Sequence, residues 1–275
     1  MKTGRRTVAV ATLVGALGLS VLNAPAADAA DTGITVSDIV INKGKPIVVG
    51  ASKEVAPPIS FNIALPAGQS TAKPSGYTAH PFIYRGKLKT AVDTGDGYIG
   101  PGIYTCFEID AKHARCEGEF HIDPHPSRRQ VNTNAAATTW KVAVALRLWK
   151  SNGGLKTEEY ETRSKTVQLK RAAKVTVAAT PETVTKGKKI TVTGKLTRAN
   201  WSTKKYGGYS GRTVSLQYRA SDATSFKTVK KVTTSSTGAL KTTVNASADG
   251  FYRWVYHGNS TTAVATSASD YIDVR

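Results

Sequence analysis

The segment Ile190-Thr-Val-Thr-Gly-Lys-Leu-Thr197 decides the fold of the second half of this sequence. Its apolar residues Ile190, Val192 and Leu196 share one parity, and Thr or Lys occupies every position of the other parity. Alternation with a period of two places one row of side chains in a core and the other in solvent, which is typical of a half-buried antiparallel strand. The segment therefore predicts a β-sheet protein in this region.

The same alternation recurs along the C-terminal part of the chain. It is found in Val214-Ser-Leu-Gln-Tyr218 and in Leu240-Lys-Thr-Thr-Val244, and about seven such runs fall between 174 and 274. Turn signals such as Ser236-Thr-Gly238 separate them. This spacing predicts an antiparallel β-sandwich over residues 173–275.

One local motif carries a family resemblance. The segment Asp249-Gly-Phe-Tyr-Arg-Trp254 resembles the tyrosine corner of immunoglobulin-like domains. On this basis, residues 173–275 resemble the immunoglobulin-like β-sandwich modules of secreted and surface proteins of high-GC Gram-positive bacteria. The resemblance implies that the Tyr252 hydroxyl bonds back to the upstream backbone and that Trp254 lies in the core. It implies no catalytic residue.

The first half is less regular. We expect a modified sandwich of about eight strands over residues 30–172, with the strands at 34–41, 45–50, 59–65, 79–86, 102–110, 115–122, 138–150 and 159–170. Gly102-Ile-Tyr-Thr-Cys106 also resembles a tyrosine corner, but the available partner, Cys116, lies downstream, which departs from the family's bridge between sheets. The segment from Trp140 to Leu146 has apolar residues on both faces, which favours a central strand.

The chain also repeats itself once. Ile41-Asn-Lys-Gly-Lys-Pro-Ile-Val-Val49 aligns with Val184-Thr-Lys-Gly-Lys-Lys-Ile-Thr-Val192 at an offset of 143 residues. Each copy predicts a strand, a turn and a second strand, so we expect two domains, 30–172 and 173–275, whose chains enter in related ways. The connection from Gln168 to Lys174 contains no Gly or Pro and is short, which limits relative motion. The expected fold class is all-β, with two tandem immunoglobulin-like antiparallel β-sandwiches.

The N-terminus predicts export. Lys2, Arg5 and Arg6 precede a charge-free, mostly apolar segment that ends at Ala27-Asp-Ala29. A positive start, a short apolar region and small residues at a cleavage site are typical of a secretory signal peptide, which we expect over residues 1–29. No later stretch reaches the roughly 18 apolar residues of a spanning helix. We expect a secreted, extracellular protein without a transmembrane segment after cleavage.

Positive charge is concentrated in the second half. The formal net charge is +19, and residues 173–275 contain 16 basic and 5 acidic residues. Such an excess attracts polyanions. The predicted partners are an anionic cell-wall polymer, a glycan or another extracellular protein, with no specific nucleic acid, and the chain is expected to be a monomer. The alternative is that the lysines only keep a β-protein soluble and protect its sheet edges.

A Gly-rich loop is the predicted binding site. It mixes cations, which hold anionic groups, with aromatic rings, which stack on sugars. Its candidate residues are Trp201, Lys204, Lys205, Tyr206, Tyr209 and Arg212. The alternative is a long hairpin loop whose Trp201 is tucked under the edge of the sandwich.

The two cysteines, Cys106 and Cys116, predict a structural disulfide that closes a β-hairpin. Such a bridge stabilises by roughly 2–3 kcal/mol. A redox pair is the alternative, but the C-x-x-C spacing of redox pairs is not present.

Two segments contain residue types that bind metals. His121, Asp123 and His125 stand at alternate positions, and Asp93 and Asp96 lie in a Gly-rich turn that a carboxylate such as Glu108 or Asp110 would complete as a weak calcium site. Pro124 and Pro126 interrupt the first segment, and the second has too few closely spaced oxygens. We therefore expect loops, and neither a metal nor a cofactor.

The sequence contains no G-x-S-x-G and no H-E-x-x-H motif, and its cysteines are expected to pair with each other. These observations predict a non-enzymatic binding protein. Two alternatives stay open: an extracellular enzyme or enzyme inhibitor with its site in the loop-rich region 66–101, and a purely structural spacer.

Overall fold

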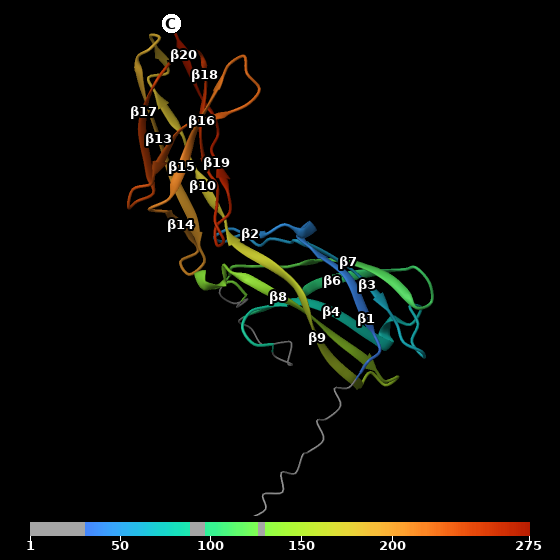
Figure 1. The fold of residues 1–275 in the computed structure, drawn as a ribbon. Coiled ribbons are helices and arrows are strands. Elements are labelled where there is room, and N and C mark those ends of the chain that lie inside the picture. Colours follow the sequence, from blue (N-terminus) through green and yellow to red (C-terminus); the bar gives the residue numbers. More distant parts are fainter. Residues whose placement is uncertain (1–30, 89–96, 126–129) are drawn as a thin grey trace, which may run out of the picture.

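The computed structural model describes residues 31–88, 97–125 and 130–275. Figure 1 shows that these residues form two bodies built mainly from strands, β1 to β9 in the first and β10 to β20 in the second. The expected signal peptide and the turn with Asp93 and Asp96 lie outside the described residues. Within the described residues no helix is long and apolar enough for a membrane crossing. The helical segments there are the 3₁₀ turns η1 (Asn42–Gly44), η2 (Pro74–Gly76) and η4 (Asn134–Ala136).

The first body is a sandwich of two sheets. Its four-stranded sheet has the order β1 (Thr35–Ile41), β3 (Pro58–Ala64), β7 (His113–Phe120), β6 (Pro101–Glu108). Its five-stranded sheet has the order β2 (Ile47–Val49), β9 (Leu155–Arg171), β8 (Thr139–Trp149), β4 (Tyr77–Tyr84), β5 (Tyr98–Ile99). The eight strands predicted from the sequence are confirmed with small differences at their ends, and β5 is an additional short strand.

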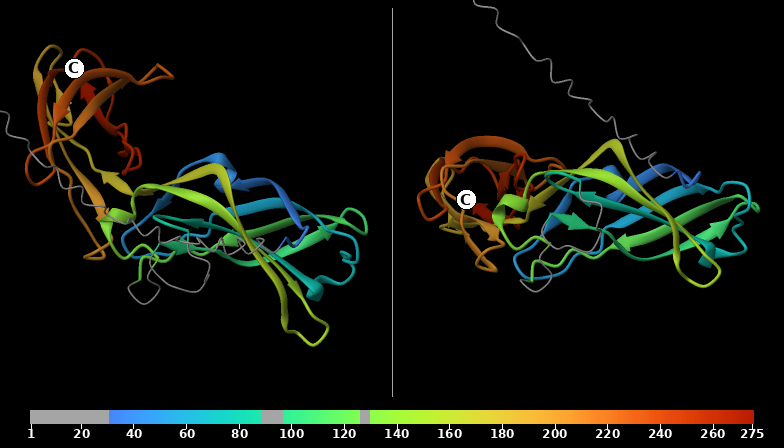
Figure 2. Two further views of the ribbon diagram at one scale, coloured as in Figure 1. Left: turned by 60° about the horizontal axis from the view of Figure 1, so that its bottom comes forward. Right: turned by 90° about the horizontal axis from the view of Figure 1, so that it is seen from below.

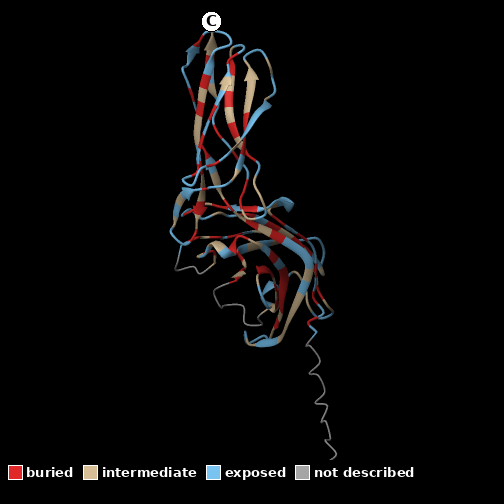
Figure 3. Ribbon diagram, turned by 60° about the vertical axis from the view of Figure 1, so that its left-hand side comes forward, coloured by how far each residue is buried: buried red, intermediate tan, exposed pale blue. Residues whose placement is uncertain are grey.

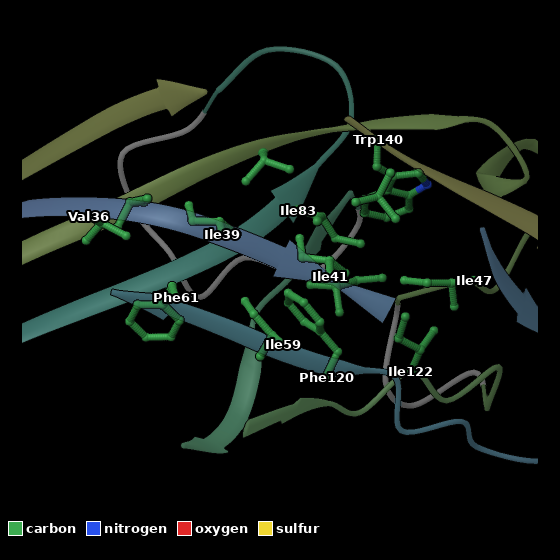
Figure 4. Packing of buried hydrophobic residues seen from close by; sticks show 14 of the residues in the cluster. Val36, Ile39, Ile41, Ile47, Ile59, Phe61, Ile83, Phe120, Ile122 and Trp140 are labelled. Atoms are coloured by element: carbon green, nitrogen blue, oxygen red, sulfur yellow. The ribbon is translucent and has the colours of Figure 1, made fainter. Parts of the chain in front are cut away.

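The core of the first sandwich lies between these sheets (Figure 4). Phe61, Phe120 and Trp140 are among its largest fully buried side chains. The predicted central strand is confirmed, because β8 lies between β9 and β4. Ala143 and Ala145 face away from the main core, yet both are fully buried in a smaller cluster on the other side of the sheet.

The predicted disulfide is confirmed as well. Cys106 and Cys116 are direct register partners on the antiparallel strands β6 and β7, and a disulfide joins them. Cys116 is fully buried and Cys106 packs against the core, so the bridge links the edge strand of the sheet to its neighbour.

The second body is also a sandwich. In one sheet β13 (Lys189–Asn200) pairs with β10 (Ala173–Val175), β11 (Ala178–Thr180), β14 (Lys205–Gly208) and β17 (Ala239–Asn245). The other sheet has the order β12 (Thr183–Val184), β20 (Asp270–Val274), β18 (Gly250–Tyr256), β15 (Thr213–Ala220), β16 (Lys227–Thr233), and β19 (Ala265–Thr266) pairs with β18. The predicted class, two tandem antiparallel sandwiches, is therefore correct.

The alternation that predicted the second sandwich is visible as alternating buried and exposed positions along its strands (Figure 3). Ile190, Val192 and Leu196 are fully buried. Trp254 is also fully buried in this core, as the family resemblance implied, and its Nε1 donates a hydrogen bond to the Thr193 carbonyl oxygen at 3.0 Å.

The expected tyrosine corner needs a correction. The hydroxyl that bonds back to the backbone belongs to Tyr218, which donates to the carbonyl oxygens of Ala248 at 2.9 Å and Asp249 at 3.0 Å. Tyr252 lies directly opposite on β18, with the two ring centroids 4.9 Å apart. Tyr252 projects into the core and is only 3% exposed. The half-buried Tyr218 lies beside the turn at residues 248–249 and supplies the hydroxyl instead.

The chain enters the two sandwiches in a related way. In each, the chain starts in one sheet and then crosses to pair in parallel with the last strand, β2 with β9 and β12 with β20. The sequence repeat nevertheless marks different strands, because its turn leads into β2 in the first copy and into β13 in the second. What the copies share is local: Gly44 and Gly187 both have positive φ, +73° and +82°, a backbone conformation that favours glycine.

Candidate functional site

The candidate site lies where the two sandwiches join. Figure 2 shows, from two further directions, the second sandwich attached to one end of the first. Ala172 alone separates β9 from β10. Its N–H donates to the Val49 carbonyl oxygen at 2.9 Å, and its own carbonyl oxygen accepts from the Ala199 N–H at 2.8 Å. The connection is thus held by backbone hydrogen bonds to both sandwiches.

Trp201 crosses this joint. It follows β13 of the second sandwich, but its side chain is fully buried in the core cluster of the first. The indole Nε1 donates to the Gly50 carbonyl oxygen at 2.9 Å, and the Trp201 N–H donates to Asn134 Oδ1 at 2.9 Å. Trp201 is therefore a packing residue of the joint, which agrees with the buried alternative and removes it from any exposed stacking surface.

The middle of the predicted loop is only partly accessible. Lys205 is exposed, while Lys204 has a buried Nζ without a hydrogen-bond partner among the described residues. Burial lowers the pKa of Lys204, and the charge of Asp123 opposes that shift. Tyr206 is half-buried against the first core, and the Lys174 ammonium lies 4.3 Å from its ring centroid. The ring of Tyr206 is thus already in contact with a cation of this chain.

Tyr209 is the centre of an arginine cluster. It is 6% exposed, and the guanidinium carbons of Arg198 and Arg212 lie 3.7 and 4.9 Å from its ring centroid. Arg198 also donates to the Thr262 hydroxyl at 3.2 Å, and Arg212 Nε donates to the Ser210 carbonyl oxygen at 3.1 Å. The predicted residues Tyr209 and Arg212 are therefore brought together, but as a stacked cluster and not as an open aromatic platform.

Arg171 completes the cluster from the first sandwich. It is the last residue of β9, and its backbone pairs with the loop around Thr262 of the second sandwich. The residue is only 7% exposed, and its Nε has no hydrogen-bond partner among the described residues. We call Arg171, Arg198, Arg212 and Tyr209 the joint cluster.

The charges of the joint cluster act on one another. Burial, followed by the charge of Arg198, lowers the pKa of Arg171 to about 10, while Tyr209 acts in the opposite direction. Burial also lowers the pKa of Arg198. Burial by itself would raise the pKa of Tyr209, but hydrogen bonds from neighbouring side chains and the charge of Arg198 outweigh it, and the pKa lies below its ordinary value. The site is strongly positive and partly desolvated.

A second positive region lies on the outside of the second sandwich. The strands β13, β16 and β17 contain no Asp or Glu. Strands β16 and β17 are linked by a hydrogen bond from Lys230 Nζ to the Thr243 carbonyl oxygen at 3.2 Å. We call the exposed lysines of these strands the cationic face. They come from both sheets, around the edge where β16 meets β17, and they are Lys189, Lys195, Lys227, Lys230, Lys231 and Lys241. None of them forms an ion pair with a described residue.

The segment from His121 to His125 makes other contacts. His121 Nδ1 lies 2.5 Å from Glu54 Oε1, and Asp123 accepts a hydrogen bond from the His125 N–H at 2.8 Å. Across the described residues, His, Cys, Asp and Glu side chains do not gather in threes in a way that would hold a metal ion.

Two residues of the joint cluster, Arg171 and Arg198, were not singled out from the sequence. A signal was nevertheless present. Arg171 continues the inward row of Val167 and Leu169, and Arg198 continues the inward row that ends in Leu196. An arginine in the apolar row of an alternating strand indicates a charge that is turned toward the interior.

No protein-family model and no curated protein matches the sequence. Among solved structures, the fibronectin(III)-like modules of Clostridium thermocellum CbhA are 13% identical with a TM-score of 0.29, and 86% of this chain and 93% of that chain are covered. The Yersinia pseudotuberculosis adhesin InvE is 11% identical with a TM-score of 0.25 and coverage of 88% and 60%. The ectodomain of mouse nectin-like molecule 4 (Ig1–Ig3) is 10% identical with a TM-score of 0.25 and coverage of 89% and 65%.

At these identities and TM-scores the similarities carry no argument about function. The fold class rests on the strand pairing itself, which defines two tandem immunoglobulin-like antiparallel β-sandwiches.

Proposed function

We propose that this chain is an exported, non-enzymatic binding protein that attaches to anionic polymers of the cell envelope through the cationic face. The family resemblance of residues 173–275 supports a location of this function at the surface of a high-GC Gram-positive bacterium. The observation that carries the proposal is the distribution of charge: three strands that lie together in one sandwich present six exposed lysines and no carboxylate.

The physical basis is multivalent attraction. A single exposed lysine contributes little in water, but several lysines on neighbouring strands act together on a chain of regularly spaced negative charges. Because the lysines of the cationic face form no ion pairs with described residues, binding a polyanion breaks no such pair. Such binding weakens as salt screens the charges.

The predicted loop takes a smaller part than its sequence suggested. Trp201 and Tyr209 are buried, so the contacts with ligand come from exposed lysines such as Lys205 and not from stacked rings. Selectivity would then depend on charge spacing and on the hydroxyl groups beside the lysines, such as those of Thr191 and Thr193, which share the outer row of β13 with Lys189 and Lys195.

The disulfide supports export. Paired cysteines persist in oxidising surroundings and are rare in the reducing cytosol. A bridge between Cys106 and Cys116 fits a protein that matures outside the cytoplasm.

Sedimentation with isolated cell walls tests the proposal. The chain from Ala30 is mixed with walls of a high-GC Gram-positive bacterium, and the bound fraction is measured from low to high salt. We expect salt-sensitive binding. The variant Lys227→Gln, Lys231→Gln, Lys241→Gln should bind roughly a hundredfold more weakly, since a lysine near an anionic surface contributes about 1 kcal/mol.

A matched variant separates the cationic face from net charge. Lys53→Gln, Lys73→Gln and Lys150→Gln remove the same charge from exposed positions of the first sandwich and should leave binding nearly unchanged. An equal loss in both variants, or no salt-sensitive binding at all, contradicts the proposal. Turnover of a hydrolase substrate or stoichiometric inhibition of a secreted protease would instead support the enzyme or inhibitor alternative.

A further inference from the structure

The positive charge of the joint cluster is not balanced by carboxylates among the described residues. Arg198 and Arg212 are stacked on the Tyr209 ring, with their guanidinium carbons 3.7 and 4.9 Å from its centroid, and Arg171 is close enough to interact electrostatically with Arg198 and Tyr209. The charged and titratable groups that act on Arg171 and Arg198 are other arginines and tyrosines. No described carboxylate forms an ion pair with any of the three arginines.

Burial makes this imbalance costly. A charged group that loses water is stable only when it is paired or fully hydrogen-bonded. Arg171 is only 7% exposed, and its Nε has no hydrogen-bond partner among the described residues. The chain nevertheless turns this side chain inward, in the row that continues Val167 and Leu169.

The arginines come from both sandwiches. Arg171 ends β9 of the first, whereas Arg198 lies in β13 of the second and Arg212 precedes β15. The Arg171 backbone N–H donates to the Thr261 carbonyl oxygen at 3.0 Å, and Arg198 Nη1 donates to the Thr262 hydroxyl at 3.2 Å. The fold therefore fixes the backbone of Arg171 and the guanidinium of Arg198 before any ligand arrives.

We propose that the joint cluster is a binding site for a tetrahedral oxyanion, a phosphate or sulfate group, held by Arg171, Arg198 and Arg212. Guanidinium groups offer planar pairs of N–H donors that match the oxygens of such an anion. The bound anion balances the buried charge and, because its ligands come from both sandwiches, stabilises the joint between them. This site is separate from the cationic face, and it goes beyond the proposed attachment to envelope polymers.

Thermal unfolding and calorimetric titration of the chain from Ala30 test the site. Inorganic phosphate and sulfate are added at constant ionic strength, with chloride as the reference. We expect a saturable rise in the unfolding temperature with phosphate or sulfate and none with chloride. Arg198→Lys keeps the charge but loses the paired donors, and it should weaken phosphate binding by about tenfold or more.

Arg171→Met distinguishes a binding role from a structural one. Without an oxyanion, the variant should be at least as stable as the parent chain, because an unpaired buried charge has been replaced by an apolar side chain of similar length. In phosphate buffer the parent chain should be more stable than Arg171→Met, because the variant no longer gains stability from bound phosphate. Circular dichroism checks that the variant is folded, and Arg212→Gln, which changes a half-exposed side chain, provides a second variant if it is not.

Two results would overturn the site: no saturable effect of phosphate or sulfate on the parent chain, or an effect that Arg171→Met and Arg198→Lys leave intact. A further titration with a glycerol phosphodiester identifies the source of the phosphate. If the diester binds, the site accepts a phosphate within a polymer. If inorganic phosphate binds and the diester does not, the site accepts a free or terminal phosphate group. The lysine variant of the cationic face should bind phosphate normally, so the two proposals fail independently.

Discussion

Replacing Trp201 by alanine should destabilise the first sandwich, although Trp201 follows a strand of the second sandwich in the sequence. A fully buried Trp removes about 200 Å² from water, which corresponds to about 5 kcal/mol at most. Large-to-small changes of this kind cost about 3–5 kcal/mol. The indole also donates to the Gly50 carbonyl oxygen at 2.9 Å, a bond worth about 1 kcal/mol. We expect Trp201→Ala to lower the free energy of unfolding by about 4 kcal/mol and Trp201→Phe, which keeps a ring, by about half as much.

Denaturant unfolding and hydrogen exchange by segment provide the assay. Because Trp201 packs in the core of the first sandwich, exchange should accelerate in β8 and less in β15. Trp254→Ala is the matched control: it removes an equally buried Trp from the second core and should accelerate exchange in β15 first. The reasoning is refuted if Trp201→Ala costs less than about 1 kcal/mol, or if its effect is confined to the second sandwich.

Other predictions concern single contacts. Gly208→Ala should destabilise by about 1–3 kcal/mol, because the added Cβ would lie 2.0 Å from a backbone carbonyl oxygen, whereas Gly207→Ala meets nothing within 4 Å and should change the unfolding midpoint very little. Replacing Cys106 and Cys116 by serine should lower stability by about 2–3 kcal/mol, and a reductant should then shift the midpoint of the parent chain but not that of the variant. Burial raises the pKa of Tyr252 from the ordinary value of a tyrosine to about 12. The folded state therefore favours the protonated phenol: its stabilising contribution is complete below pH 10 and is lost as the pH rises toward 12. Alkaline unfolding followed by ultraviolet absorbance should show this loss, and a Tyr252→Phe variant whose stability falls just as steeply over that interval would contradict it.

Much of the fold could be predicted from alternation along single strands. The row Ile190, Val192 and Leu196 faces the core as expected, and the two-sided apolar segment that starts at Trp140 is a central strand. These predictions succeed because the parity of a side chain is a local property of the strand. The Cys106–Cys116 bridge could be predicted for a similar reason, since a hairpin brings nearby positions into register.

The binding loop shows where local reasoning ends. Its mixture of Trp, Tyr, Lys and Arg indicated an exposed surface, yet Trp201 lies in the core of the other sandwich and Tyr209 lies under two guanidinium groups. The tyrosine corner is a second example. The strand register makes Tyr218 and Tyr252 neighbours, and the burial of each side chain decides which hydroxyl reaches the turn at residues 248–249.

The sequence by itself determined the strands, their inward rows and the excess of positive charge in the second half. Only the tertiary structure decided which sandwich buries Trp201, and that Arg171 and Arg198 meet across the joint. The physical reason is that alternation states which side of a strand is turned inward, whereas the contacts of that side depend on segments far away in the chain.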